Sequence, residues 1–406
     1  GSPNFVNIFS GNACYLPRVA GCIATTGAFW VADCAQQFPD RYDNPAWQMP
    51  ETMFVWGNYL LIANPDGFFG HWIVDVMKEG GTKLIVLDPS CTWLASKAEH
   101  WLQVRPGTDA AVVISMLGVI IEEDLYDHDI PNDKDLAGRL FISAGLGGMS
   151  GAQGKAAEIA GIDADDIRAA ARAYASGNPS TIQWGLKVDQ TVCGIPLAQA
   201  LLSRGAICGD IDVPGGMMIP RCAYDIPDSY GCGMWTLSDE MLGKMLGVDT
   251  SPLHALGFDP TANGDTVLLA IETGEPYPIR MVWMTSTNPI ANMGADAPRL
   301  FRALKSVDFV VVNDLFMTPT AIAFADLVLP AAMSPERNSQ RCWWVPNRTL
   351  TKVTQYEECV SDDDLVTMVG KRLHPENFPW DDNVGWINHI FEHETNDELP
   401  YKSFEE

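Results

Sequence analysis

The residues best suited to chemistry in this chain follow two expected strands. Arg105-Pro106-Gly107-Thr108-Asp109 comes directly after the short apolar run 101–104, and it lies seventeen residues beyond Asp88-Pro89, which closes the run 83–87. Tight polar turns at strand ends are where an open α/β sheet binds its ligand. Backbone N–H groups at a helix start attract a pyrophosphate, and a carboxylate such as Asp109 can accept two hydrogen bonds from a guanine edge. The two turns therefore predict a guanine dinucleotide.

Short apolar strands alternate with apolar helices and would position these turns. The patterns predict helices over 71–78, 110–122 and 299–304, and strands over 53–56, 83–87, 181–185, 280–284 and 309–312. This alternation favours parallel sheets with crossover helices. Because each half contains strands that end in polar turns, we expect an α/β fold with two Rossmann-like, doubly wound lobes.

The two expected lobes meet near residue 180. A helical pattern over 162–172 has Asp163 as its N-cap, and acidic residues fill its first turn. Gly177-Asn178-Pro179 then ends this helix before the next strand. We therefore expect one lobe over residues 1–180 and a second over residues 181–406.

Composition limits the classes of partner. The chain has 406 residues, 47% of them hydrophobic, and a net charge of −26 from 52 acidic and 26 basic residues. This balance argues against nucleic acid and anionic membrane surfaces as partners, because both require clustered cations. No apolar run reaches the ~18 residues of a membrane span, and no targeting peptide is visible.

The cysteines indicate reduced thiols. No two of the ten form a C-x-x-C pair; they stand at positions 14, 22, 34, 91, 193, 208, 222, 232, 342 and 359. A disulfide framework is typical of short, cysteine-dense chains, whereas this is a large α/β chain. The spacing favours a cytoplasmic or anaerobic setting.

An ordered set of motifs resembles a known family. The set comprises Gly81 to Pro89 with Thr92, Arg105 to Asp109, Trp184-Gly185 to Gln190, Gly209 to Gly216, Asn288-Pro289, Asn313-Asp314, Thr318, Thr320-Ala321 and Ala325 to Pro330. In this order it resembles the molybdopterin oxidoreductases related to dimethyl sulfoxide reductase. The resemblance covers most of the chain. It implies molybdenum or tungsten held between two pterin guanine dinucleotides.

The resemblance also implies a metal ligand. Cys14 occupies the position from which the family supplies its protein ligand to the metal. A thiolate is a soft donor suited to a metal that already binds dithiolene sulfurs. On the residues alone, a small buried hydrophobe is the commoner role of a free cysteine.

The residues next to Cys14 narrow the branch of the family. Formate dehydrogenases of the family carry histidine directly after the ligand, whereas this chain has Tyr15. With the segment 64–72, this is more similar to the branch of acetylene hydratase and gut-bacterial catechol dehydroxylases. Tyr15 would then donate a proton to a substrate oxygen and Arg18 would hold an anion. The alternative is that both merely pack or hydrogen-bond beside the ligand loop.

Cofactor contacts carry over from the family by position. In the first lobe the matching residues are Trp56, Gly57, Asn58, Asp88, Pro89, Ser90, Thr92, Arg105, Gly107, Thr108 and Asp109. In the second lobe they are Leu186, Gln190, Asn288, Asn313, Asp314 and Arg337. Amides and carboxylates read base edges, while backbone donors hold phosphates. The competing interpretation is local: Asn-Pro is a common turn, and Asp after a strand often caps a helix.

Two departures from the family lie in the first lobe. Ser90 stands where the family usually has arginine, and Tyr59-Leu60 stands where it has asparagine-proline. Both remove a charge or an amide from the phosphate side. Since the second lobe is intact, we expect the full-length protein to bind both pterins.

The resemblance further implies that the chain is the central part of a larger subunit. A 4Fe-4S cluster is expected in a segment upstream, and a β-barrel-like domain downstream. The expected partners are a small-molecule substrate and an iron–sulfur electron-transfer subunit. The compartment stays open, because a twin-arginine export signal would also lie upstream.

Several functions remain open. Reductive removal of an aromatic hydroxyl is the preferred chemistry, with non-redox hydration second and a cofactor-free nucleotide-binding fragment third. A nicotinamide dehydrogenase is disfavoured, because no G-x-G-x-x-G follows a strand and the glycine-rich run 145–151 has serine at the third position. His389 to His393 matches H-x-x-E-H, but no third zinc ligand is evident and zinc hydrolysis is disfavoured.

Overall fold

The computed structural model describes most of the chain. The described residues are 4, 6, 16–26, 48–63, 68–128, 152–191, 193–217, 238–250, 261–292, 296–341, 348–392 and 403–405. The chain divides into two compact units. We call residues 12–221 the first unit, and residues 1–11 with 222–406 the second unit.

The first unit contains a four-stranded parallel sheet with the order β3-β2-β1-β4. Its strands are β1 (Thr52–Trp56), β2 (Lys83–Leu87), β3 (His100–Leu102) and β4 (Ser180–Trp184). Thr52 is in register with Lys83 on one side and with Ser180 on the other. Because all strands are parallel, their carboxyl ends lie along one edge, which we call the first strand-end edge.

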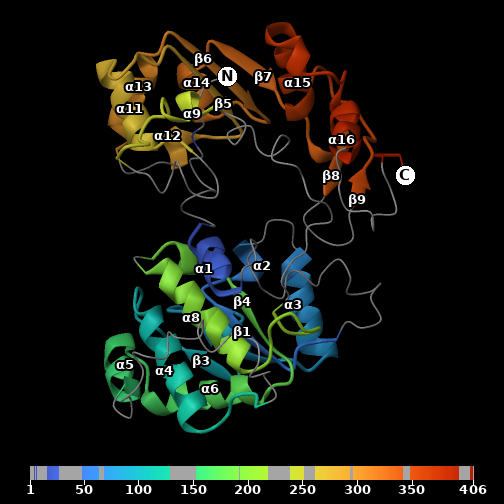
Figure 1. Ribbon diagram of the computed structural model, residues 1–406. Coiled ribbons are helices and arrows are strands. Elements are labelled where there is room, and N and C mark those ends of the chain that lie inside the picture. The colour runs from blue at the N-terminus through green and yellow to red at the C-terminus, as the bar shows by residue number, and fades with distance from the viewer. Residues whose placement is uncertain are drawn as a thin grey trace. The chain divides into compact units, whose positions relative to one another are not determined.

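Helices cover both faces of this sheet, as Figure 1 shows for α3 and α8. The described helices of the first unit are α1 (Leu16–Thr26), α2 (Leu60–Ala63), α3 (Phe68–Glu79), α4 (Asp109–Glu122), α5 (Ala152–Ala160), α6 (Ala164–Ser176), α7 (Leu186–Asp189) and α8 (Gly194–Ile207), with a 3-10 turn at Ala95–Lys97. All five residues of β1 are buried. Strands buried on both faces are typical of doubly wound sheets.

The two faces of β1 pack differently. Met53 and Val55 join an aliphatic cluster with Ile73 of α3. On the other face, the guanidinium of Arg204 lies over the rings of Phe54, Trp56 and Tyr174, with its central carbon 4.5, 5.6 and 4.2 Å from the ring centroids. Arg204 is fully buried, and burial lowers its pKa. Aromatic faces stabilise such a cation through their quadrupoles.

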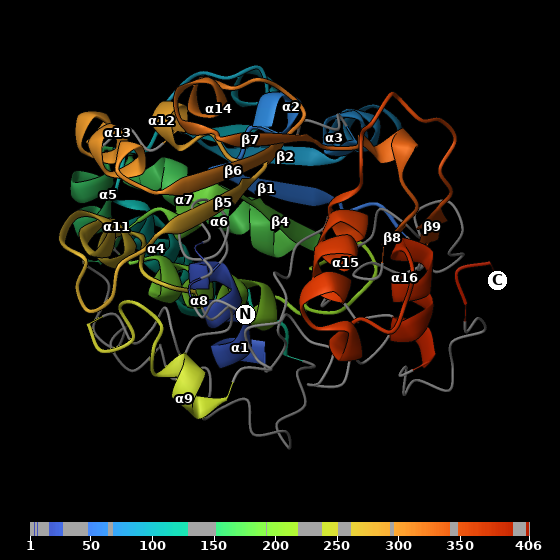
Figure 2. The same ribbon diagram turned by 90° about the horizontal axis from the view of Figure 1, so that it is seen from above.

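The second unit contains a three-stranded parallel sheet with the order β5-β6-β7. Its strands are β5 (Met281–Thr285), β6 (Phe309–Asp314) and β7 (Leu327–Pro330), and β8 (Ser339–Arg341) pairs antiparallel with β9 (Arg348–Leu350). Figure 2 shows β5, β6 and β7 side by side. Their carboxyl ends form the second strand-end edge.

The described helices of the second unit have 4 to 12 residues. They are α9 (Asp239–Leu242), α11 (Gly264–Thr273), α12 (Pro289–Asn292), α13 (Ala297–Lys305), α14 (Pro319–Phe324), α15 (Asp362–Leu373) and α16 (Asn383–Glu392), with 3-10 turns at Ser334–Glu336 and Pro375–Asn377. Met284, Val310, Val312 and Phe324 are members of the core of its parallel sheet. Asn4 also belongs to this unit, because its amide donates to Tyr277 Oη at 2.8 Å.

The predicted α/β class and its parallel sheets are confirmed. The expected strands match β1, β2, β4, β5 and β6 within two residues at each end, and Asp163 caps α6 by accepting from the Asp165 N–H. The expected boundary near 180 differs from the division at 221, because β4 pairs with β1 inside the first unit. Residues 181–217 therefore belong to the first unit rather than to the second lobe.

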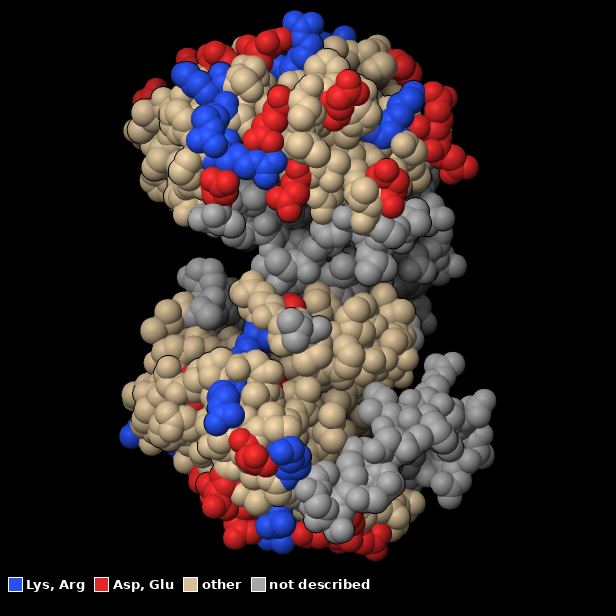
Figure 3. Space-filling model, turned by 90° about the vertical axis from the view of Figure 1, so that its left-hand side faces the viewer, with Lys and Arg blue, Asp and Glu red and all other residues tan. Residues whose placement is uncertain are grey.

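Charge is mixed on the described surface. On the face in Figure 3, Lys and Arg residues lie among Asp and Glu residues. Among the described helices, none is long and apolar enough to cross a bilayer.

Candidate functional site

The turn after β1 binds the neighbouring strands together. Gly57 has a φ of +59°, and its N–H donates to Leu87 O at 3.4 Å. The Gly185 N–H donates to Trp56 O at 3.2 Å, and the Asn58 amide donates to Trp184 O at 3.2 Å. The predicted residues Trp56, Gly57 and Asn58 thus stand at the first strand-end edge, although Trp56 itself is fully buried.

The turn after β2 uses its polar groups locally. Asp88 Oδ1 accepts from the Ser90 N–H at 2.8 Å, and Thr92 Oγ1 accepts from the Ala95 N–H at 3.1 Å. The Gln103 amide donates to Pro89 O at 3.1 Å. These bonds match the local turn role that the sequence left open for an Asp after a strand. The exposed Ser90 places no charge at this edge.

The turn after β3 presents an open backbone. Gly107 has a φ of +87°, and a Cβ added there would meet nothing within 4 Å. The Arg105 guanidinium donates to Ile159 O at 3.0 Å, while Thr108 Oγ1 donates to Arg105 O at 2.6 Å. Arg105 therefore binds carbonyls at the end of α5, and Gly107 and Thr108 lead into the first turn of α4.

Asp109 is the most unusual group at this edge. Its side chain is 3% exposed, and Lys187 Nζ of α7 lies 3.3 Å from Asp109 Oδ1. This is ion-pair distance without hydrogen-bond alignment: both Asp109 oxygens and Lys187 Nζ are buried with no hydrogen-bond partner among the described residues. A buried carboxylate normally fills its acceptor capacity, so the unfilled capacity of Asp109 makes it the candidate ligand-binding group of this edge.

Lys187 was not among the residues predicted from sequence. Its stem passes over Gly57: a Cβ on Gly57 would lie 2.5 Å from Lys187 Cβ. The only sequence signal was its place inside the motif from Trp184 to Gln190. Of the predicted residues, Leu186 begins α7 and Gln190 is the C-cap that follows it, and both are exposed.

Arg18 lies on α1 and forms a buried ion pair with Asp189 of α7. Its Nε donates to Asp189 Oδ2 at 2.5 Å and its backbone N–H donates to Oδ1 at 3.0 Å. The side chains are 7% and 0% exposed. Burial raises the pKa of Asp189 to about 6, and Arg18 opposes this rise. The predicted residues Cys14 and Tyr15 lie outside the described residues.

At the second strand-end edge, three predicted residues make hydrogen bonds within the second unit. Asn288 Oδ1 accepts from Thr320 Oγ1 at 2.6 Å, and Asn313 Nδ2 donates to Asp362 Oδ1 at 2.5 Å. Asp314 Oδ1 accepts from a backbone N–H two residues along the chain at 3.3 Å. Thr320 and Asp362 were not predicted as site residues, because they join the edge from distant segments.

Arg337 also lies near this edge. Its guanidinium stands 3.9 Å from Asp362 Oδ2, and its Nε has no hydrogen-bond partner among the described residues. Burial raises the pKa of the adjacent Asp363, and Arg337 opposes this rise. The cluster Asn313, Arg337 and Asp362 thus joins the end of β6 to the start of α15.

The motif Gly209 to Gly216 has a structural role at the opposite end of the first sheet. Asp210 Oδ1 accepts from the N–H of Ser180, the first residue of β4, at 2.9 Å. Thr181 Oγ1 donates to Gly216 O at 3.0 Å. This motif anchors the start of β4 and contributes nothing to the strand-end edge.

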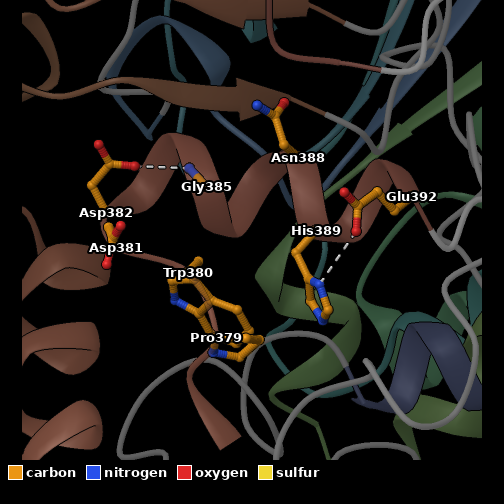
Figure 4. A pocket seen from close by; sticks show the side chains of 8 residues that line it. All are labelled: Pro379, Trp380, Asp381, Asp382, Gly385, Asn388, His389 and Glu392. Carbon is orange, nitrogen blue, oxygen red and sulfur yellow. Dashed lines mark hydrogen bonds and ion pairs between the residues drawn. The ribbon is translucent and has the colours of Figure 1, made fainter. Parts of the chain in front are cut away.

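A separate hollow of about 510 Å³ lies on the second unit, beside α16. In Figure 4, Trp380 and His389 line it, and His389 Nδ1 lies 3.7 Å from Glu392 Oε2. Asp382 Oδ1 already accepts a hydrogen bond from the Gly385 N–H at 2.8 Å. Within the described part of the chain, no group of three or more His, Cys, Asp or Glu side chains is arranged to hold a metal ion.

The strand order β3-β2-β1-β4, with helices on both faces, defines a doubly wound α/β fold in the first unit. Residues 68–340 match the molybdopterin oxidoreductase family, so the chain belongs to this family and the resemblance seen in the sequence is confirmed.

Three relatives give the context. The chain is 30% identical over 344 residues to acetylene hydratase of Syntrophotalea acetylenica, covering 76% of this chain and 45% of that protein. It is 32% identical over 247 residues to dopamine dehydroxylase of Eggerthella lenta, covering 57% and 24%. The solved structure of acetylene hydratase from Pelobacter acetylenicus matches with a TM-score of 0.74 at 25% identity, covering 92% and 52%. The chain thus spans about half, or less, of the length of these relatives.

The family implies a molybdopterin cofactor with molybdenum or tungsten, and the first unit fits one. Asp109 holds unused acceptors beside the start of α4, where aligned N–H groups favour anions. Gly107 leaves open space at the same turn. An anionic nucleotide with a guanine edge would use both features.

Proposed function

We propose that this chain is the cofactor-binding core of the catalytic subunit of a molybdenum- or tungsten-dependent oxidoreductase that binds two pterin guanine dinucleotides. One observation carries the proposal: the buried carboxylate of Asp109 has two unused acceptor oxygens at a strand-end edge. The N1–H and exocyclic amine of guanine supply two parallel donors that suit such a carboxylate.

Each unit holds one dinucleotide in this proposal. In the first unit the N–H groups at the start of α4 hold phosphate, while the turn at Gly57 and Asn58 lies beside the pterin. The residues assigned to the first unit are Trp56, Gly57, Asn58, Asp88, Pro89, Ser90, Thr92, Arg105, Gly107, Thr108, Asp109, Leu186 and Gln190. Those assigned to the second unit are Asn288, Asn313, Asp314 and Arg337.

The residues before and within α1 serve the metal. We assign Cys14 as its protein ligand and Tyr15 as a proton donor to a substrate oxygen. Arg18 is bound to the buried Asp189, which favours a role in fixing α1, and with it the preceding ligand loop, over direct anion binding. When bound, the metal cofactor supplies two-electron chemistry.

The preferred reaction is reductive removal of an aromatic hydroxyl. Such a step consumes two electrons and two protons, replaces the C–O bond by C–H and releases water. Similarity to dopamine dehydroxylase supports this reaction. The electrons would come from an iron–sulfur partner, through a 4Fe-4S cluster in a longer form of this protein.

Hydration is the second candidate. The similarity to acetylene hydratase extends over 76% of this chain, against 57% for the dehydroxylase. Adding water to a triple bond transfers no net electrons. A requirement for a stoichiometric reductant therefore separates the two reactions.

The experiment is an anaerobic purification of the full-length protein, followed by metal analysis and acid release of guanine nucleotide. We expect one molybdenum or tungsten and two GMP per protein. Reduced viologen with a catechol tests dehydroxylation, and acetylene without reductant tests hydration. Absence of both metals and of GMP would instead support a cofactor-free nucleotide-binding fragment.

The variant Cys14→Ala tests the metal ligand. We expect loss of turnover with retention of GMP, because the dinucleotides bind elsewhere. Cys91→Ala is the matched control, since Cys91 is exposed and assigned no role. Turnover by Cys14→Ala equal to that of the control would refute metal ligation by Cys14.

A further inference from the structure

We propose that Lys187 is a positioning residue of the guanine subsite: it fixes the Asp109 carboxylate for recognition of the base. The inference rests on the proposed function and adds a residue to it. It starts from one juxtaposition, the ammonium of Lys187 at 3.3 Å from a carboxylate that is 3% exposed.

The first step concerns burial. An ionised carboxylate out of water requires a compensating partner. Among the described residues, no hydrogen bond reaches either oxygen of Asp109, so Lys187 is the group that compensates its charge. A lysine ammonium has no acceptor lone pair and cannot itself be read by the base N–H donors. Its effect on these two guanine donors must therefore pass through Asp109.

The second step concerns how Lys187 reaches Asp109. Its Cβ, Cγ and Cδ pass within 2.5 to 3.1 Å of where a Gly57 side chain would begin. Gly57 has no side chain, and its φ of +59° suits glycine. The turn after β1 therefore leaves a channel for a lysine that starts from α7, after β4.

The third step concerns geometry. The ion pair lacks hydrogen-bond alignment, and the ammonium leaves both carboxylate oxygens without a hydrogen bond. The parallel donors of guanine can therefore bind without displacing Lys187. Three strand ends, those of β1, β3 and β4, contribute to one recognition element: Gly57, Asp109 and Lys187.

The test measures binding of GMP and IMP to the full chain by calorimetry. IMP lacks the exocyclic amine, so wild type should prefer GMP by roughly tenfold to a hundredfold. Lys187→Met should weaken GMP binding by about tenfold or more and reduce the preference over IMP. Lys187→Arg, which keeps the cation, should restore most of both. Lys83→Met is the matched control, because Lys83 pairs loosely at 3.7 Å on the surface.

A double variant tests whether Lys187 affects GMP binding through Asp109 or by direct contact. In an Asp109→Asn background, Lys187→Met should cost no further GMP affinity. A further loss as large as in wild type would overturn the inference, because Lys187 would then bind the nucleotide directly. If Lys187→Met does not fold, the comparison of Lys187→Gln with Lys187→Arg replaces it.

The remaining outcomes separate the two levels of the proposal. Wild-type protein that binds neither nucleotide overturns the guanine site and the inference with it. Wild-type protein that prefers GMP, together with an unchanged preference in Lys187→Met, overturns the role of Lys187 and leaves the proposed function standing.

Discussion

The two strand-end edges carry similar residue types but distribute their hydrogen bonds differently. At the first edge, Asp109 and Lys187 are paired by charge and keep unused hydrogen-bonding capacity. At the second edge, Asn288 and Asn313 already bind Thr320 and Asp362. Asn313 Oδ1 and Arg337 Nε at the second edge also have no hydrogen-bond partner among the described residues. The difference is that both oxygens of the Asp109 carboxylate lack a hydrogen bond at the first edge, whereas Asn288 and Asn313 at the second edge each make one to a side chain from a later segment.

The largest expected effect tests the support beneath the first edge. Arg18→Met leaves the buried Asp189 without its cation and should lower the free energy of unfolding by about 3–5 kcal/mol at pH 7.5. Urea unfolding measures it. Arg172→Met, which breaks the exposed pair with Glu123, should cost under about 1 kcal/mol. If both variants lose the same free energy of unfolding, the buried pair of Arg18 and Asp189 stabilises the protein no more than the exposed pair of Arg172 and Glu123.

The same variant has a predictable pH dependence. Because burial raises the pKa of Asp189 to about 6, its contribution to stability falls as pH rises from about 4 toward 6. Without Arg18 the pKa of Asp189 rises further. Protonated Asp189 needs no cation, so the cost of Arg18→Met should shrink at pH 4.5. A cost that grows at low pH would contradict this assignment.

Asn313→Asp tests the second edge. It replaces a donor to Asp362 by a second carboxylate at a position that is 1% exposed, and should destabilise the protein by about 2–3 kcal/mol. Asp362→Asn, which keeps an acceptor oxygen, should cost less. Thermal unfolding of both variants provides the measurement. The reverse order would show that the amide of Asn313 does not rely on Asp362.

Two glycine variants separate strain from crowding at the first edge. Gly57→Ala and Gly107→Ala both place a side chain at positive φ, which costs about 1–2 kcal/mol. Only Gly57→Ala also meets Lys187, at 2.5 Å. We therefore expect Gly57→Ala to be the more destabilising by about 1 kcal/mol, and to weaken GMP binding more. If Gly57→Ala and Gly107→Ala bind GMP with equal affinity, the space that Gly57 leaves for Lys187 has no role in guanine binding.

The smallest expected effect concerns phosphate. Ser90→Arg restores the charge that the family usually has at this exposed position and should strengthen GDP binding by roughly three- to tenfold. Guanosine, which lacks phosphate, should bind unchanged. Calorimetry with both ligands measures the difference. A gain for guanosine as large as for GDP would mean that Ser90 lies away from the phosphates.

Local patterns predicted the strands of the two parallel sheets except β7, because apolar runs between polar turns determine a parallel strand almost alone. The Asp163 cap was equally local. The unit boundary does not depend on local sequence. Only the pairing of β4 with β1, two distant segments, assigns residues 180–184 to the first unit. Helix-breaking residues mark the end of a helix and not the end of a domain.

The sequence predicted the turn residues of the candidate site but not the contacts between residues from distant segments. Gly107 and Asp109 follow a strand in sequence and were found there. Lys187 and Asp362 act on residues 78 and 49 positions away, and no spacing rule reports such contacts. The local bonds of Asp88 and Thr92 show that polar turn residues also serve the backbone that presents them.

The cation enclosed by Phe54, Trp56 and Tyr174 constrains which substitutions the core of the first unit can tolerate. Arg204 needs these rings, because its Nε and Nη2 have no hydrogen-bond partner among the described residues. Losing one ring would strand the charge, and losing the charge would leave the rings around a gap. Across related chains these four positions should therefore change together or not at all, whichever substrate the enzyme has come to use.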